Sequence, residues 1–390
     1  MSQSATLRER QDRAVPKGVA TKSLYAARAE NAELWDVDGR RYIDFAAGIA
    51  VLNTGHRHPK VMAAVAAQAA LFTHTSFNVA PFEAYIRLAE RLNAMAPGGS
   101  AKQTLLVSTG AEAVENAVKI ARVATGRSAV IAFAGGFHGR TLMALALTGK
   151  VVPYKRGFGP FPAEVYHAPF PHLYHGISVE DALAGLERLL AADVDPARVA
   201  AMIVEPVLGE GGFIVAPPAF LQGLRRVADQ HGMLLIVDEV QTGMARTGKM
   251  FAIEHAGVVP DLITTAKGLA GGFPLAAVTG RADVMSAVQP GGLGGTYAGN
   301  PLSVAAANAV LDVIAEEHLC ERATEIGARL TERLHELERR QGFECIGEVR
   351  GLGAMVAMEI VKDRTSRAPN PALAEALLAE AQKRGLVLLS

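Results

Sequence analysis

The sequence predicts an α/β fold with a mostly parallel, doubly wound sheet, because short apolar runs alternate with helical periods through the middle of the chain. The runs that predict strands are Thr104 to Val107, Ala129 to Phe133, Ala201 to Val204, Leu234 to Val237 and Ala276 to Val278. The clearest helical periods between them are Glu112 to Arg122 and Pro218 to His231. One apolar run ends abruptly in Asp238 and Glu239. That pattern is typical of a buried parallel strand whose last residues lie at the sheet edge where ligands bind.

A chain of 390 residues is too long for one simple domain, and we expect three segments. Residues 1–58 contain a predicted hairpin, in which Leu34-Trp35 and Tyr42-Ile43 flank the turn signal Asp36-Val37-Asp38-Gly39. Residues 59–300 should form the large domain. Residues 301–390 should form a smaller α+β domain, joined by the N-terminal segment, with a long helix over Pro301 to Gln341 and a strand segment over Glu348 to Ile360.

The composition excludes several classes of protein. Lys plus Arg and Asp plus Glu both number 39, so nothing draws the chain to nucleic acid or to an anionic membrane. Met1 to Arg13 show no secretory signal, and the longest apolar stretches, such as Val61 to Phe72, are too short to span a bilayer. The two cysteines, Cys320 and Cys345, suit a reduced compartment and lack a metal-binding spacing. We therefore expect a soluble, cytoplasmic protein without a nucleic-acid or membrane partner.

Two segments predict an active site. The acidic strand end carries Asp238, and further along the chain Lys267 lies between the small residues Ala266 and Gly268. A lysine that bonds covalently to a cofactor, with a carboxylate for a pyridinium nitrogen, is what pyridoxal phosphate chemistry needs.

The segment Leu105 to Glu112 reads as a strand that turns into a helix at Gly110. The free amides at the start of such a helix can hold a phosphate. The alternative is an ordinary helix start, capped by Thr109 with Glu112 completing a capping box.

Three glycine-rich turns leave a functional and a structural interpretation open. In Gly135 to Arg140, Phe137 could stack on a planar ring or pack in the core, and Arg140 could bind a carboxylate or carry a surface charge. The segment Gly209 to Gly212 around Glu210 could be an active-site loop or a surface turn. In Gly294 to Pro301 a hydroxyl could bind a phosphate, or the turn could cap the next helix through Asn300.

Two further patterns are weaker. Gly243 to Lys249 has the spacing of a nucleotide-binding P-loop, which would indicate a non-catalytic ATP-binding protein, but Met250 stands where the magnesium-binding Ser or Thr belongs. His56-Arg57-His58 and the trio His167, His172 and His175 lack a carboxylate or cysteine at a recognised ligand spacing, so we expect loop histidines and no metal.

The acidic strand, the lysine loop, the Phe137-His138 turn and the Thr296 turn, occurring together in this order, resemble the class III pyridoxal-phosphate aminotransferases. The closest branch is that of the 4-aminobutyrate aminotransferases, and the resemblance runs from about Trp35 to Ser390. It implies fold type I, pyridoxal 5'-phosphate as cofactor, and a homodimer or dimer of dimers whose active sites are shared between subunits.

The resemblance also implies roles for individual residues. Lys267 would hold the cofactor covalently, and Asp238 would keep its pyridine nitrogen protonated. The phosphate would be held by Gly110, Ala111 and, from the partner subunit, Thr296. The remaining expected cofactor contacts are Phe137 and Val240 on the two ring faces, His138, and Gln241 near the phenolic oxygen. The expected substrate residues, which shape the pocket and hold carboxylates, are Ile49, Arg140 and Glu210.

The implied reaction moves the terminal amine of 4-aminobutyrate, or of 5-aminovalerate, to 2-oxoglutarate, which gives succinate semialdehyde and glutamate in the first case. Ornithine or acetylornithine is the nearest alternative donor and is disfavoured by Ile49, since ornithine-type enzymes are expected to carry a tyrosine there. An aminomutase or racemase of the same family is a second alternative and would need no external amino acceptor.

Two positions depart from the family pattern. Leu208 replaces the glutamine of the Glu-Pro-Val-Gln-Gly-Glu motif, which is expected to change the bonding around Glu210. The chain ends at Ser390, before the segment in which the family carries a second carboxylate-binding arginine that pairs with the Glu210 position. We expect a truncated form.

Overall fold

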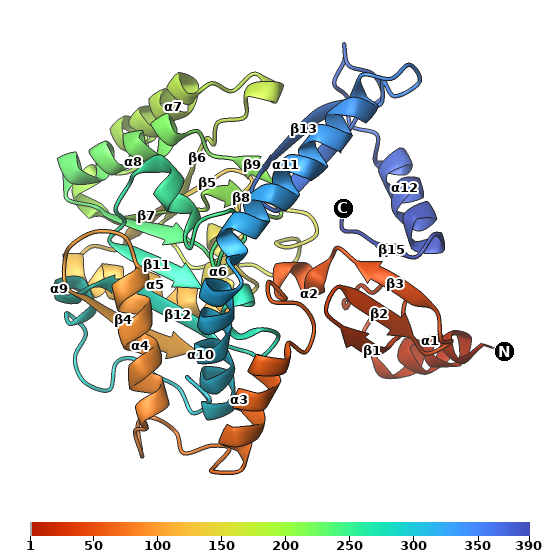
Figure 1. Ribbon diagram of the computed structural model, residues 1–390. Coiled ribbons are helices and arrows are strands. Elements are labelled where there is room, and N and C mark those ends of the chain that lie inside the picture. Colours follow the sequence, from red (N-terminus) through yellow and green to blue (C-terminus); the bar gives the residue numbers. More distant parts are fainter. Residues whose placement is uncertain (1) are drawn as a thin grey trace.

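The computed structural model describes residues 2–390 and contains a central seven-stranded sheet (Figure 1). The strand order is β4-β12-β11-β10-β7-β5-β6, and only β12 runs antiparallel to its neighbours. The strands are β4 (Lys102–Val107), β5 (Ala129–Phe133), β6 (Val165–Ala168), β7 (Val199–Val204), β10 (Leu234–Asp238), β11 (Leu262–Thr265) and β12 (Ala276–Arg281). The predicted fold class is confirmed, while β6 and β11 were not among the predicted strands.

Helices cover both faces of this sheet, which is what doubly wound means. One face packs against α5 (Gly110–Thr125), α6 (Leu142–Leu147) and α9 (Ala282–Met285). The other packs against α3 (Pro59–Ala69), α4 (Glu83–Met95), α7 (Val179–Ala192), α8 (Pro218–His231) and α10 (Pro301–Glu316). Within β10, Leu234 and Ile236 face the first group and Leu235 and Val237 face the second, so the whole apolar run is buried.

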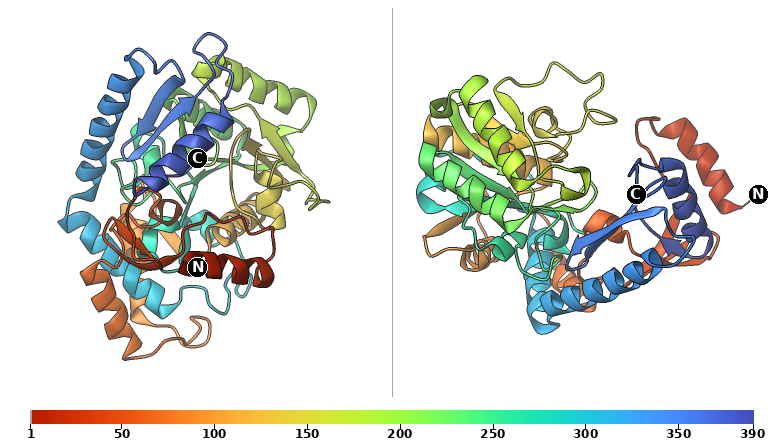
Figure 2. Two further views of the ribbon diagram at one scale, coloured as in Figure 1. Left: turned by 90° about the vertical axis from the view of Figure 1, so that its right-hand side faces the viewer. Right: turned by 90° about the horizontal axis from the view of Figure 1, so that it is seen from above.

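The two ends of the chain meet in a second sheet of four strands. It is formed by β1 (Ala26–Glu30), β2 (Glu33–Asp36), β3 (Arg41–Asp44) and β15 (Leu386–Val387), and it follows α1 (Gln3–Ala14). The predicted hairpin is confirmed, with Leu34 opposite Tyr42. Because β15 pairs with β3, the N-terminal and C-terminal segments lie together beside the main body (Figure 2). This pairing agrees with the expected three segments, whose boundaries at residues 58 and 300 stay a prediction.

The region after residue 300 differs from the prediction in two places. The single helix expected over 301–341 is wrong: α10 ends at Glu316, and α11 (Leu319–Glu338) begins after His318, whose φ of +51° no continuous helix allows. The expected strand over 348–360 is instead an antiparallel hairpin of β13 (Ile346–Leu352) and β14 (Met355–Ile360), which α11 packs against. The helix α12 (Pro371–Lys383) leads from the hairpin to β15.

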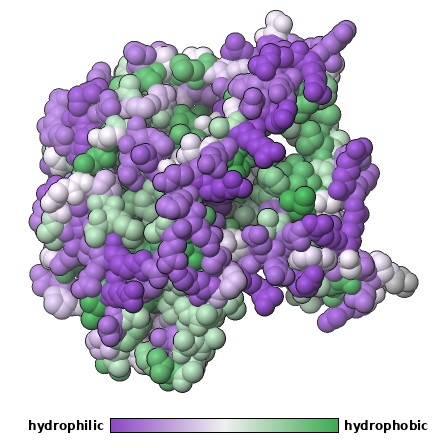
Figure 3. Space-filling view, in the orientation of Figure 1, coloured by the Kyte–Doolittle hydropathy of each residue, from purple (hydrophilic) through white to green (hydrophobic). Residues whose placement is uncertain are grey.

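Shorter elements complete the fold. They are α2 (Ala47–Ala50), β8 (Val207–Leu208), β9 (Ile214–Val215) and the 3₁₀ turns Leu173–His175, Pro196–Arg198, Ala252–Ala256 and Lys267–Ala270. On the face drawn in Figure 3, polar residues alternate with smaller apolar areas. Over residues 2–390, none of the helices combines the length and apolar character that crossing a membrane requires.

Candidate active site

A cavity of about 400 Å³ lies where the parallel strands of the large sheet end. Its walls come from the turns after β4, β5, β7, β10 and β11, and from the segment that enters β12. The predicted site residues that line it are Gly110, Ala111, Phe137, His138, Asp238, Val240, Gln241 and Lys267. Residues from distant parts of the chain therefore meet at the sheet edge where open α/β folds bind ligands.

Asp238 is the last residue of β10 and is buried beneath the cavity. Its carboxylate accepts hydrogen bonds from the Thr264 hydroxyl at 3.1 Å and the Val240 amide at 3.1 Å, and its other oxygen lies 2.7 Å from His138 Nδ1. Burial disfavours the charged imidazole, but the hydrogen bond and negative charge of Asp238 outweigh it and raise the pKa of His138. The pair therefore places a fixed carboxylate, already supplied with donors, at the floor of the cavity.

Glu205, directly after β7, is a second buried carboxyl group of the cavity that the sequence did not assign a role. It accepts hydrogen bonds from the Phe137 amide at 2.7 Å and the Gly209 amide at 3.0 Å. Burial raises the pKa of Glu205 to about 7, although the charge of His138 opposes the shift. Glu205 thus ties the turn that carries Phe137 to the loop that follows β7.

Lys267 points its amine into the same space. Its Nζ donates a hydrogen bond to Gln241 Oε1 at 2.8 Å, and burial lowers the pKa of the amine despite the nearby carboxylates. A lowered pKa increases the neutral fraction, which is the nucleophilic form. The backbone is held tightly here: Lys267 has a φ of +37°, and a Cβ at Gly268 would lie 2.4 Å from Asn53 Nδ2.

The start of α5 forms the opposite wall. Thr109 and Glu112 form the predicted capping box, in which the Glu112 amide bonds to the Thr109 hydroxyl at 3.2 Å and the Thr109 amide bonds to the Glu112 carboxylate at 2.9 Å. The amides of Gly110 and Ala111 lie in the first turn, where a helix offers no acceptor of its own. The capped helix and the anion cradle are therefore compatible rather than exclusive alternatives.

Four predicted site residues do not line the cavity. Thr296 is exposed, Ile49 is 49% exposed with a φ of +65°, Arg140 is exposed, and Glu210 is half-buried on the loop between β8 and β9. Leu208, the departure from the family motif, is buried in β8 and would contact any Cβ added at Gly135 or Gly211. It therefore packs the base of the Glu210 loop by apolar contact.

Arg140 and Glu210 are linked by a residue that the sequence did not single out. The Tyr154 hydroxyl donates a hydrogen bond to Glu210 Oε2 at 2.8 Å, and the Arg140 guanidinium carbon lies 4.8 Å from the centre of the Tyr154 ring. No motif surrounds Tyr154 in the sequence, so no local signal could have identified it.

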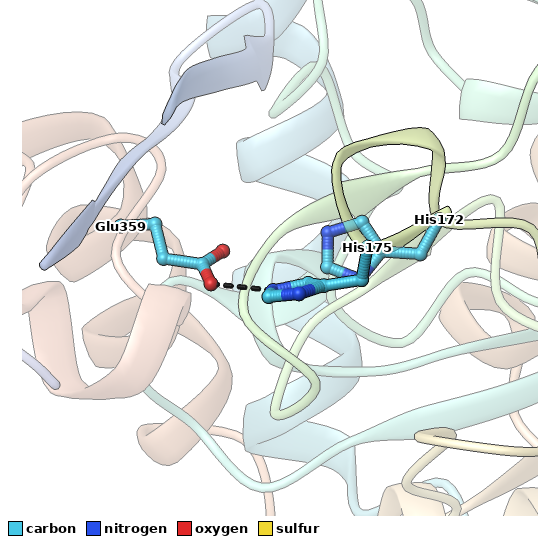
Figure 4. A group of neighbouring side chains, drawn as sticks. All are labelled: His172, His175 and Glu359. Atoms are coloured by element: carbon cyan, nitrogen blue, oxygen red, sulfur yellow. Dashed lines mark hydrogen bonds and ion pairs between the residues drawn. The ribbon is translucent and has the colours of Figure 1, made fainter. Parts of the chain in front are cut away.

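The histidines considered as metal ligands are separated by the fold. His167 bonds to the Leu147 carbonyl, whereas His172 and His175 lie together beside Glu359 of β14 (Figure 4). Their ligand atoms lie within 4.8 Å of one another, and His175 Nε2 is 2.6 Å from Glu359 Oε1. The Arg350 guanidinium, however, donates to the other oxygen of Glu359 at 2.6 Å and so supplies the positive charge that a cation would bring. The group joins the turn after β6 to the β13–β14 hairpin as an ion-pair network.

The segment Gly243 to Lys249 also differs from a P-loop. It folds as a series of turns, and no helix opens after it before the 3₁₀ turn at Ala252–Ala256. A P-loop requires a helix directly after the glycine-rich turn.

Comparison with known proteins identifies the family. The sequence profile described as aminotransferase class-III matches residues 14–390. The chain belongs to the class III aminotransferases.

Curated class III aminotransferases are similar over nearly the whole chain. The sequence is 53% identical to the 4-aminobutyrate aminotransferase GabT of Escherichia coli (strain K12), over 100% of this chain and 91% of that protein. It is 54% identical to the 5-aminovalerate aminotransferase DavT of Pseudomonas putida, over 99% and 90%.

Solved aminotransferase structures share the fold. The ornithine aminotransferase of Toxoplasma gondii has a TM-score of 0.88 at 32% identity, covering 100% of this chain and 87% of that one. An amine transaminase from an uncultivated Pseudomonas species, solved in a PLP-bound form, has a TM-score of 0.87 at 33% identity, covering 96% and 89%.

Pyridoxal phosphate is the cofactor of class III aminotransferases, and the cavity offers the groups that it requires. A buried amine of lowered pKa lies opposite a buried carboxylate, and two helix N-terminal amides are free for a phosphate. A Cβ at Gly110 would meet Val240 at 3.0 Å, so the start of α5 can lie this close to the Val240 side chain only because this residue is glycine. The donor set of the cavity therefore fits this cofactor.

Proposed function

We propose that this aminotransferase moves the terminal amine of 4-aminobutyrate, or of 5-aminovalerate, to 2-oxoglutarate. The first donor gives succinate semialdehyde, and both reactions give glutamate. The proposal is carried by one observation: Lys267, with its lowered amine pKa, shares a cavity with the His138–Asp238 pair in a chain that matches relatives named for these two donors along their length.

The residues of the cavity take distinct roles in this proposal. Pyridoxal phosphate, when bound, supplies an electron sink for the carbon that loses its proton. Lys267 Nζ carries that proton as a general base and returns it as an acid. Asp238 holds a proton on the ring nitrogen, since a carboxylate fixed by two hydrogen-bond donors and His138 favours a cationic partner.

The other cofactor contacts orient the ring. The amides of Gly110 and Ala111 hold the phosphate at the positive end of α5. Phe137 and Val240 both line the cavity, and they would contact the two faces of the ring. Gln241, whose side-chain oxygen accepts the Lys267 hydrogen bond, would donate to the phenolic oxygen through its amide nitrogen.

Arg140, Ile49 and Glu210 are the proposed substrate residues. Arg140 forms no ion pair with any carboxylate of residues 2–390, so its guanidinium is available for the carboxylate of the donor. Ile49 adds an apolar side chain at the expected pocket wall, which favours an unbranched ω-amino acid over ornithine.

A homodimer completes this proposal, because Thr296 is exposed and is not among the residues that line the active-site cavity. Tyr297, next to Thr296 in the sequence, is 67% exposed, and its ring lies 5.0 Å from the ring of His74. The segment that carries His74 also exposes the apolar side chains of Leu71 and Val79. This exposed apolar surface supports the proposal that a second copy of the chain covers the region. A cytoplasmic location stays part of the proposal.

The test is a visible absorption spectrum of the purified protein loaded with pyridoxal phosphate. The band of the bound cofactor should bleach with 4-aminobutyrate and return with 2-oxoglutarate. Lys267→Ala should abolish the cycle, and Lys249→Ala, which alters an exposed lysine of the false P-loop, should leave it intact. A band that both donors leave unchanged would refute the proposed substrates, and turnover without any 2-oxo acid would indicate an aminomutase or racemase.

A further inference from the structure

Tyr154 lies at the contact point of three residues that the proposed function uses. It is buried, with its ring 5.0 Å from the Phe137 ring and 4.8 Å from the Arg140 guanidinium carbon. Its hydroxyl donates a hydrogen bond of 2.8 Å to Glu210. One side chain therefore meets a cation with its ring and an anion with its hydroxyl.

The two charges that Tyr154 contacts do not pair with each other. Glu210 lies on the loop between β8 and β9, and Arg140 lies just before α6. A guanidinium and a carboxylate that share a neighbour normally form a direct pair, because a bidentate bond satisfies both. In residues 2–390 Arg140 has no carboxylate within 4.0 Å, and the hydrogen bond to Glu210 comes from Tyr154 instead.

The hydroxyl of Tyr154 is a dependable donor at working pH. Burial, together with the hydrogen bond and negative charge of Glu210, raises the pKa of Tyr154 to about 12. The phenol therefore keeps its proton throughout the neutral range and remains able to donate to Glu210.

We propose that Tyr154 is a positioning residue that holds Glu210 away from Arg140 and thereby leaves the guanidinium available for the carboxylate of an amino-acid substrate. The inference rests on the proposed role of Arg140 as the carboxylate-binding residue. Without the hydroxyl, Glu210 is released and competes with the substrate for the same cation. A tyrosine that served only for packing would instead act through its ring, which phenylalanine retains.

The test compares two probes that each carry one half of the substrate. Valerate has the carboxylate without the amine, and n-butylamine has the amine without the carboxylate. Valerate binding to the holoenzyme is measured by titration calorimetry, and the reaction of n-butylamine is followed through the visible band of the bound cofactor. The variants are Tyr154→Phe, Glu210→Gln, the double variant and Arg140→Ala, each accepted only with a native circular dichroism spectrum.

Tyr154→Phe should raise the dissociation constant of valerate about two- to fivefold, which is the upper range of a partly exposed ion pair. The n-butylamine reaction should stay within about twofold of the parent rate. In the Glu210→Gln background, adding Tyr154→Phe should change valerate affinity by less than about twofold, because the neutral amide cannot compete for Arg140. This dependence on Glu210 is the signature that a packing role would lack.

Four results would overturn the proposal, and they can be told apart. An unchanged valerate affinity in Tyr154→Phe, or a loss that persists in the Glu210→Gln background, removes the role of Tyr154 while Arg140 keeps its own. If Tyr154→Phe fails to fold, Glu210→Gln alone tests the proposal. A gain in valerate affinity of more than about tenfold in this variant would show that Glu210 competes for Arg140 even while Tyr154 is present. An unchanged affinity in Arg140→Ala would refute the substrate assignment itself.

Discussion

Glu239, the second carboxylate of the acidic pair at the end of β10, gives a prediction about stability that is separate from catalysis. It is 1% exposed and does not line the cavity, unlike its neighbour Asp238. Its oxygens accept hydrogen bonds from the Ile253 amide at 2.8 Å and from the Thr242 hydroxyl. Burial nevertheless dominates and raises the pKa of Glu239 to about 7.

The size of the effect follows from this shift. Raising the pKa from 4.5 to about 7 corresponds to about 3 kcal/mol at 1.36 kcal/mol per unit. The folded state binds the proton more tightly than the unfolded state, so this contribution is complete below about pH 4.5 and is lost as the pH rises through about 7. The unfolding entropy is about 2.1 cal/mol/K per residue, so for 390 residues a change of about 3 kcal/mol in the free energy of unfolding shifts the melting temperature by about 4 °C.

Glu239→Gln should remove this dependence, because the amide fills the same space and stays neutral. The melting temperatures of parent and variant are compared by calorimetry between pH 5 and pH 8. The difference in melting temperature, variant minus parent, should rise by about 3 °C over that range, which covers most of the shift. The contribution of Glu205 cancels because both proteins carry it. Glu187→Gln, at an exposed position of α7, should show a flat difference. A flat difference for Glu239→Gln as well would refute the claim that burial governs this carboxyl group.

Three further predictions concern the site and the C-terminal region. Lys267→Ala should bind no cofactor covalently, so borohydride reduction should add no cofactor mass to the intact chain. Asp238→Asn should keep the cofactor at saturating concentration and lower kcat roughly 10²–10³-fold, the usual cost of losing one preorganised charge; an unchanged kcat would contradict its assignment. Gly327→Ala should lower the melting temperature, because the added Cβ would clash with the carbonyl oxygen of Gly353. Overpacking of this kind costs about 1–3 kcal/mol, whereas the higher helix propensity of alanine returns at most about 1 kcal/mol. Gly99→Ala, with no atom within 4 Å of the added Cβ, should leave the melting temperature unchanged.

Patterns that depend on local chemistry could be read from the sequence. The β2–β3 hairpin follows from its turn residues, and the start of α5 follows from the Thr109 and Glu112 cap. The break between α10 and α11 could not be read, because no glycine or proline lies at His318, where the backbone is left-handed. The β13–β14 turn was missed because Gly353 lies in an otherwise strand-like run.

The cavity residues were predictable where they stand at strand ends, and the substrate residues were less so. Asp238 ends β10 and Lys267 follows β11, and these two parallel strands end at the same edge of the sheet. Thr296 and Arg140 are exposed and do not line the cavity, so the fold of residues 2–390 alone leaves their expected roles a prediction. Tyr154 had no signal at all, since its role depends on two charges from distant loops.

The strand β11 shows why a functional site is also where local patterns fail. Its sequence, Leu262 to Thr265, was not predicted as a strand because half of it is polar, yet all four residues are buried at the centre of the sheet. A buried threonine is costly unless its hydroxyl is bonded, and Thr264 meets that need by donating to Asp238 from the adjacent strand. The same hydrogen bond that makes the residue tolerable in the core fixes the orientation of the carboxylate beneath the cavity. The polar interruption that weakened the strand prediction is therefore part of the site.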